Sequence, residues 1–276
     1  MRYFKQYGTR RSGTNFLRAL LEQNFSNTTV LMHTLGGKHN PPVNLKIFSA
    51  QFQNDSFAFV EAATAAEPAE NCLPFSSEQR QYMMDHAKAI QDSVRNKTLH
   101  FLISVKEPYA WINSMFKYWL NDKNENDPEV IDEFCKLVSI QCAEYNAAYR
   151  SYLELFQKYP QQTTIVHYHN LIKNPFGFLN GLKSRLSLEK SSETYFSPKK
   201  IIHPTDWDQQ QSHLRLAKKD FDPDYYLQRK YLQSMRPEVI DCISKSIDWN
   251  LMAFYGYEKI NSVSCYKTKP TINAAI

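Results

Sequence analysis

A phosphate-loop spacing lies near the N-terminus of this 276-residue chain. Gly8 and Gly13 are separated by four residues, at a predicted junction between a strand and a helix. In such a strand–loop–helix junction, backbone amides and the positive end of the helix dipole converge on an anion. A nucleoside-triphosphate loop would continue with lysine and then serine or threonine, for the phosphates and for magnesium. Thr14 and Asn15 take those places here, so the lysine and the magnesium ligand are missing.

The missing magnesium ligand bears on the kind of group that the loop holds. Phosphoryl transfer from a triphosphate relies on a metal ion to neutralise several charges. A sulfuryl group carries less charge and can react without a metal, so the departure favours sulfuryl transfer. A P-loop kinase of nucleotides or metabolites is the alternative, and it predicts magnesium dependence and triphosphate binding.

The elements that must position this loop alternate between strand and helix. Strands are predicted over residues 2–7, 99–105 and 163–168, and the second of these is a nearly continuous apolar run. Helical spacing and capping residues predict helices that begin near Gly13, Ser76, Asp127, Asn174 and Asp222. Two helices are expected in the C-terminal quarter. This alternation indicates an α/β class, a three-layer P-loop-type fold with a central, mostly parallel sheet flanked by helices. Ligands of such sheets bind beyond the carboxyl ends of the strands, where the loop lies.

One segment of the loop resembles a known family. Residues 10–17, RRSGTNFL, are similar to the 5′-phosphosulfate loop of sulfotransferases that use 3′-phosphoadenosine 5′-phosphosulfate (PAPS), usually written P-K/R-S-G-T-T/N-W/F-L. The resemblance implies that Arg11 contacts the bridging oxygen and stabilises the leaving phosphate. It also implies a set of residues that bind the donor: Arg10, Arg11, Ser12, Gly13, Thr14, Asn15 and Phe16.

A second segment resembles the family's 3′-phosphate motif. Lys106 closes a strand, Pro108 and Tyr109 follow, and Ser114 comes one helical stretch later. The resemblance implies that Lys106 and Ser114 bind the 3′-phosphate. Lysine replaces the usual arginine, and it meets a phosphate as a point charge without a bidentate fork. The similarity continues loosely to residue 258, which implies a single domain over residues 1–258 and a tail over 259–276.

The acceptor must lose a proton as it attacks sulfur, so a histidine or glutamate is required as general base. The family supplies this base from a segment that follows the first helix. His39 is our candidate, because the neighbouring Lys38 favours a neutral imidazole, and Lys38 would stabilise the transferring group. His33 and Glu61 are the competing candidates.

Composition limits the partners. The net charge of +5 suits an anionic ligand but is too dispersed for a nucleic-acid surface. We expect no nucleic acid, no membrane and no metal at the site, with PAPS as co-substrate and a small-molecule or glycan acceptor. No apolar stretch suggests a leader or an anchor, which predicts a cytoplasmic location. The stretch 188–221 shows little periodicity and could be a lid over the nucleotide.

A non-catalytic nucleotide-binding relative is the second alternative. Two departures from the family pattern would support it: Lys106, and His169 with Asn170 in place of an acidic pair at the end of the third strand. The sequence does not reveal the acceptor, the oligomeric state or the basic residue of the C-terminal part that meets the 3′-phosphate.

Overall fold

The computed structural model describes residues 1–31, 34–39, 55–64, 77–120, 127–197, 200–204, 214–220 and 222–260. The chain divides into two compact units. The first comprises residues 1–106 and 147–222, and the second comprises 107–146 and 223–276. Each unit is described by itself, and the expectation of a single domain over residues 1–258 stays a prediction.

The first unit is built on a four-stranded parallel sheet with strand order β2-β1-β3-β4. The strands are β1 (Arg2–Gly8), β2 (Thr28–Leu31), β3 (His100–Val105) and β4 (Thr163–His167). Phe4 of β1 is in register with Val30 of β2 and with His100 of β3. Because all four strands run in the same direction, β1, β3 and β4 end at one edge of the sheet. The loop after Gly8, Lys106 and the start of the helix after β4 therefore meet there.

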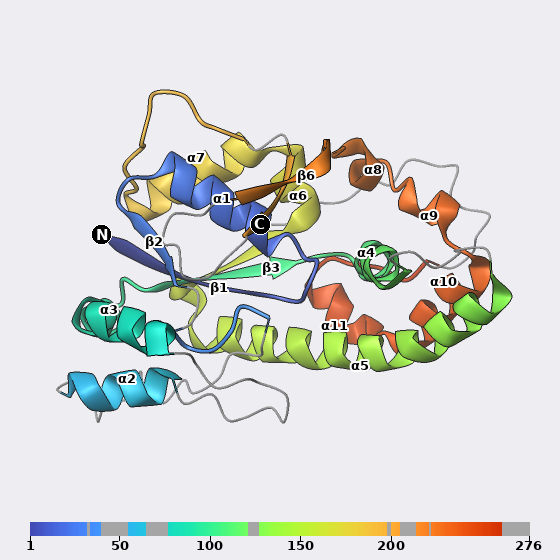
Figure 1. The fold of residues 1–276 in the computed structure, drawn as a ribbon, viewed down its shortest axis with the longest axis horizontal. Coiled ribbons are helices and arrows are strands. Elements are labelled where there is room, and N and C mark those ends of the chain that lie inside the picture. The colour runs from blue at the N-terminus through green and yellow to red at the C-terminus, as the bar shows by residue number, and fades with distance from the viewer. Residues whose placement is uncertain are drawn as a thin grey trace. The chain divides into compact units, whose positions relative to one another are not determined.

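Helices cover both faces of this sheet, as Figure 1 shows. On one face lie α1 (Thr14–Asn24), α6 (Tyr168–Lys173) and α7 (Pro175–Leu186), and on the other α3 (Ser77–Arg95) packs against β1. α2 (Ser56–Thr64) packs on α3. The buried cluster between α1, α7 and the sheet contains Phe4, Leu17, Leu20, Leu21, Val30, Leu102, Val166, Leu179 and Leu182. This arrangement confirms the predicted α/β class with three layers.

The two units share one long helix. α5 runs from Pro128 to Lys158, and a 3-10 turn over Pro160–Gln162 leads from it into β4. The second unit otherwise contains α4 (Pro108–Leu120), α8 (Asp224–Leu227), α9 (Tyr231–Ser234), α10 (Pro237–Ser246) and α11 (Trp249–Phe254). Tyr109 of α4 bonds Ser244 of α10 between hydroxyls 2.7 Å apart, and Trp249 donates its indole N–H to the Ser244 carbonyl at 2.9 Å.

The structure corrects two expectations about the elements. The described C-terminal quarter holds four short helices where two were expected. Asp222 is not the N-cap of the helix near it: Pro223 has helical angles (φ −64°, ψ −32°) and its carbonyl accepts the first helical bonds, so Pro223 is the N-cap. Within the expected lid stretch, β5 (Lys200–Pro204) pairs antiparallel with β6 (Leu214–Asp220).

Candidate active site

The loop between β1 and α1 turns through residues in the left-handed backbone region. Arg11 has φ 64° and Gly13 has φ 89°. A Cβ on Gly13 would lie 2.4 Å from the ring of Tyr168, and one on Gly8 would lie 2.6 Å from Ser12 Oγ. Close packing therefore requires glycine at both positions, and the backbone conformation requires it at Gly13. A turn of this kind ahead of a helix is typical of sites where backbone N–H groups bind an anion.

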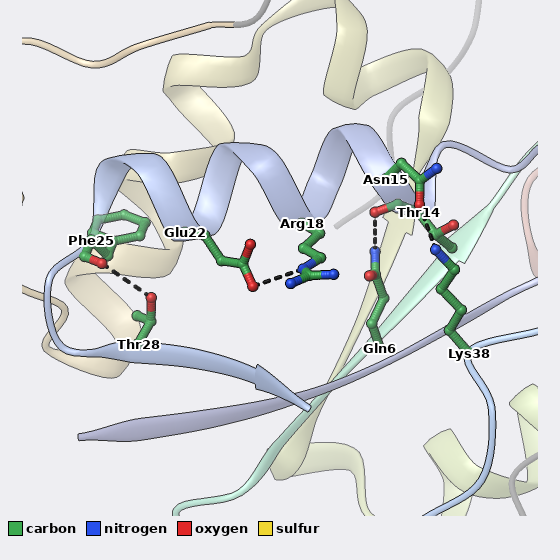
Figure 2. A network of polar contacts seen from close by, with 8 residues as sticks. All are labelled: Gln6, Thr14, Asn15, Arg18, Glu22, Phe25, Thr28 and Lys38. Atoms are coloured by element: carbon green, nitrogen blue, oxygen red, sulfur yellow. Dashed lines mark hydrogen bonds and ion pairs between the residues drawn. The ribbon is translucent and has the colours of Figure 1, made fainter. Parts of the chain in front are cut away.

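Side chains of the sheet hold this loop through its carbonyl groups. Ser104 of β3 donates to the Ser12 carbonyl at 2.7 Å, and Gln6 of β1 donates to the Thr14 carbonyl at 2.8 Å (Figure 2). Gly13 is the N-cap of α1 and has no side chain to offer to the first-turn N–H groups. The loop is thus held in shape through its carbonyl groups, and the N-cap residue gives the first-turn amides no side-chain bond.

Three basic side chains belong to this edge of the sheet. Arg10 and Arg11 are exposed on the loop, whereas Lys106, after β3, is buried. Lys106 Nζ donates to the Arg11 carbonyl at 3.3 Å and lies 4.5 Å from the centre of the Tyr168 ring. The backbone of Lys106 is fixed by Tyr149, whose hydroxyl accepts from its N–H at 2.7 Å and donates to its carbonyl at 3.0 Å. Lys106 therefore supports the loop as well as adding charge beside it.

Ser114, the other residue predicted for the 3′-phosphate, lies on α4 in the second unit. Its hydroxyl donates to the Ala110 carbonyl at 2.9 Å and is 3.2 Å from the hydroxyl of Tyr226. Lys117, one turn further along α4, donates to the hydroxyl of Tyr225 at 2.6 Å. A 3′-phosphate site shared by Lys106 and Ser114 stays a prediction.

The segment 34–39 brings the proposed base to the loop. His39 Nδ1 lies 2.8 Å from the carbonyl oxygen of Gly8, the last residue of β1. A carbonyl only accepts, so Nδ1 carries the proton and Nε2 of the neutral ring is the nitrogen that can take one. Burial lowers the pKa of His39 to about 4, the bond to Gly8 opposes this, and the charges of Lys38 and Arg10 lower it further. The ring is therefore neutral at pH 7.

Lys38 reaches from the same segment to the first turn of α1. Its ammonium donates to the side-chain oxygen of Asn15, as Figure 2 shows. Burial lowers the pKa of Lys38 to about 8, and the nearby Arg18 lowers it while Glu22 raises it. Arg18 and Glu22 form an ion pair with a nitrogen–oxygen distance of 2.7 Å along α1. A cation thus lies beside both the start of α1 and His39.

Sequence reasoning missed the groups that hold this segment. Lys5 of β1 donates to the Gly36 carbonyl, and Tyr7 donates its hydroxyl to the Leu35 carbonyl at 2.6 Å. The N–H of Gly8 donates to the Lys38 carbonyl at 2.9 Å. A lysine inside a buried strand was the signal that could have identified them.

Comparison with known protein families identifies the family of the chain. The sulfotransferase domain family matches residues 7–194. The chain belongs to the sulfotransferase family. Among solved structures, this sulfotransferase is similar to the "Sulfotransferase Domain from the Synechococcus PCC 7002 Olefin Synthase", with 16% identity, 88% of this chain and 93% of that chain covered, and a TM-score of 0.42. No curated protein sequence matches it.

Membership of the family makes the sulfotransferase a PAPS-dependent transferase. The residues present fit this co-substrate. The turn at Gly13 leaves no room for a Cβ, the first-turn amides of α1 lack a side-chain cap, and Arg10, Arg11 and Lys38 supply positive charge. These are the features that a phosphosulfate requires.

Other residues singled out from the sequence have different surroundings. Phe16, predicted to bind the donor, is partly buried and packs against the hydrophobic cluster under α1. Glu61 is exposed on α2, and His33 lies outside the described residues. Burial and the neighbouring His169 lower the pKa of His167 at the end of β4. Among the residues that the structure describes, no group of three or more His, Cys, Asp or Glu side chains could hold a metal ion, and no helix is long and apolar enough to cross a membrane.

Proposed function

We propose that this sulfotransferase moves the sulfuryl group of PAPS to a hydroxyl or amine of a carbohydrate or small metabolite, with His39 as general base. The observation that carries the proposal is the 2.8 Å contact between His39 Nδ1 and the Gly8 carbonyl. It ties the histidine to the strand end from which the donor loop starts. It also fixes the tautomer in which Nε2 accepts a proton.

The proposed step moves one bond and one proton. Bound PAPS supplies a sulfuryl group on a phosphate leaving group. The acceptor oxygen or nitrogen bonds to sulfur as the bond between sulfur and the bridging oxygen breaks, and the electron pair stays on that oxygen. His39 Nε2 takes the acceptor proton, Arg11 offsets the charge on the phosphate, and Lys38 offsets the charge of the transferring group.

The strength of His39 as a base is expected to rise when the donor binds. A pKa of about 4 keeps the ring neutral at pH 7 but makes it a weak base. The charges of Lys38 and Arg10 contribute to this low value. An anion bound against those two cations offsets their effect, so the pKa of His39 moves up toward the operating pH.

Calorimetry tests the donor half of the proposal. The probe is adenosine 3′,5′-bisphosphate, the nucleotide product, with ATP and magnesium as the comparison. We expect micromolar binding of the product without metal, and loss of most of that binding in Arg11→Ala. A preference for ATP with magnesium would indicate a kinase instead, and no binding of either nucleotide would overturn the assignment of the loop.

Transfer of labelled sulfate from PAPS to a panel of sugars, phenols and amines tests the base. His39→Gln should lower kcat by roughly 10²- to 10⁴-fold, with the affinity for the product nucleotide nearly unchanged. The matched control is His86→Gln, because His86 Nδ1 also lies near a backbone carbonyl, that of Tyr82 at 3.0 Å, on α3. An unchanged kcat in His39→Gln would remove His39 from the mechanism. Product binding without transfer to any member of the panel would favour the non-catalytic alternative.

A further inference from the structure

A lysine lies in the interior of the sheet, on the strand that leads into the donor loop. Lys5 is on β1, which pairs with β2 on one side and β3 on the other, and none of its surface is exposed. A lysine is rarely buried completely, because removal of an ammonium group from water is unfavourable. A buried lysine in this strand is therefore expected to have a structural or functional role.

The contacts of Lys5 indicate this role. Its ammonium donates to the Gly36 carbonyl and lies 5.2 Å from the centre of the Tyr7 ring. Tyr7, two residues along the same face of β1, donates its hydroxyl to the Leu35 carbonyl at 2.6 Å. Burial is the main cause that lowers the pKa of Lys5 to about 7, and the charge of Lys38 adds to it. Two side chains of one strand thus hold two consecutive carbonyl groups.

The held residues have a backbone conformation that needs support. Leu35 has φ 66° and Gly36 has φ 85°, so two successive residues lie in the left-handed region. This conformation is unfavourable for a leucine, and it persists where the surroundings enforce it. Three residues after Gly36 comes His39, whose Nδ1 must meet the Gly8 carbonyl for Nε2 to be the accepting nitrogen.

We propose that Lys5 is a positioning residue for the general base: it holds segment 34–39, through the Gly36 carbonyl, in the conformation that presents His39 Nε2 to the acceptor. Tyr7 acts with it through the Leu35 carbonyl. Lys5 touches no reacting atom and acts only through the segment. The inference rests on the proposed function, because it takes His39 to be the base.

Lys5→Met tests the inference, since methionine fills similar space without the ammonium. We expect the variant to fold, because burial of an ammonium group is costly and methionine is apolar. Without the bond to Gly36, the ring of His39 becomes more solvated and its pKa, followed by NMR titration of the imidazole, rises from about 4 by one unit or more toward 6.5. The charges that act on His39 are those of Lys38 and Arg10, so loss of the Lys5 charge does not itself explain such a rise.

The kinetic readout separates positioning from binding. In Lys5→Met, kcat should fall about tenfold or more, while the affinity for adenosine 3′,5′-bisphosphate changes little, because small displacements of a catalytic group cost rate. The matched control is Lys190→Met. Lys190 also donates to a backbone carbonyl, that of Glu193 at 3.1 Å, and lies 4.1 Å from a tyrosine ring, that of Tyr195. It should leave both the His39 pKa and kcat unchanged.

Tyr7→Phe provides the second variant, because it keeps the ring and removes only the hydroxyl bond to Leu35. It should raise the His39 pKa in the same direction as Lys5→Met. If both variants bind the product nucleotide normally and leave the His39 pKa and kcat at wild-type values, the positioning role is refuted. If the pKa rises but His39→Gln is fully active, the base assignment is wrong although the structural role of Lys5 holds.

Discussion

Replacement of Gly13 by alanine tests the shape of the donor loop most directly. The left-handed backbone at φ 89° costs an alanine about 1 kcal/mol. The new Cβ would also lie 2.4 Å and 2.7 Å from two ring carbons of Tyr168, so the ring or the turn must move. Overpacking of this kind costs roughly 1 to 3 kcal/mol. Together we expect Gly13→Ala to lower the free energy of unfolding by roughly 2 to 4 kcal/mol.

Variants of two other glycines separate the backbone cost from the packing cost. Gly256 has φ 70° and nothing within 4 Å of an added Cβ, so Gly256→Ala carries the backbone cost of about 1 kcal/mol alone. Gly181, within α7, has no neighbour within 4 Å of an added Cβ either. Gly181→Ala should stabilise the protein by roughly 0.5 to 1 kcal/mol, because alanine favours a helix over glycine.

Urea unfolding of the three variants, together with calorimetric titration of adenosine 3′,5′-bisphosphate, gives the result. We expect Gly13→Ala to be the least stable of the three and the only one that loses affinity for the nucleotide. If Gly13→Ala loses no more stability than Gly256→Ala, the packing against Tyr168 does not constrain the loop. If it is destabilised but binds the nucleotide normally, the turn is not the donor site.

Three further outcomes follow from the contacts described above. Burial lowers the pKa of His39 to about 4 and that of His100 to about 3 in the folded protein. As the pH falls from 6.5 toward 4, these histidines therefore bind protons in the unfolded chain but not in the folded one. The free energy of unfolding should fall by up to roughly 3 kcal/mol per histidine. His100→Gln should flatten this dependence in urea titrations at successive pH values, and an unchanged slope would contradict the assignment. Tyr149→Phe should cost about 1 to 3 kcal/mol in the same assay, since it leaves the buried backbone of Lys106 without two hydrogen bonds. Ser104→Ala removes the bond to the Ser12 carbonyl and should lower the free energy of nucleotide binding more than the free energy of unfolding. Calorimetry measures the first quantity and urea unfolding the second. The opposite order would show that the loop keeps its shape without this bond.

The parts of the site that lie close together in the sequence could be predicted. The spacing from Gly8 to Gly13 predicted a strand, a turn and a helix. The prediction was possible because sterics and packing leave few residues other than glycine possible at those two positions. The nearly continuous apolar run at 99–105 indicated a strand buried on both faces, and β3 occupies 100–105. His39 was chosen from its neighbours, and the structure places it against Gly8.

The parts that depend on contacts across the chain could not be predicted. β2 has only four residues, Thr28–Leu31, too few for a periodicity to be visible. The bonds from Lys5 and Tyr7 to segment 34–39 join residues about thirty positions apart, and only the pairing of β1 in the sheet brings them together. The β5–β6 hairpin lies in a stretch without clear alternation, where local pattern carries no signal.

The alternation of side chains along β1 makes the length of this strand a functional constraint. Phe4 and Gln6 face α1, where Gln6 holds the carbonyl of Thr14, while Lys5 and Tyr7 face the segment that carries His39. One strand therefore holds the proposed donor loop on one face and the segment of the proposed base on the other. Insertion or deletion of a single residue in β1 would move its side chains to the opposite faces of the sheet, and the contacts on both faces would be lost. We therefore expect related chains to keep the residue count of this strand.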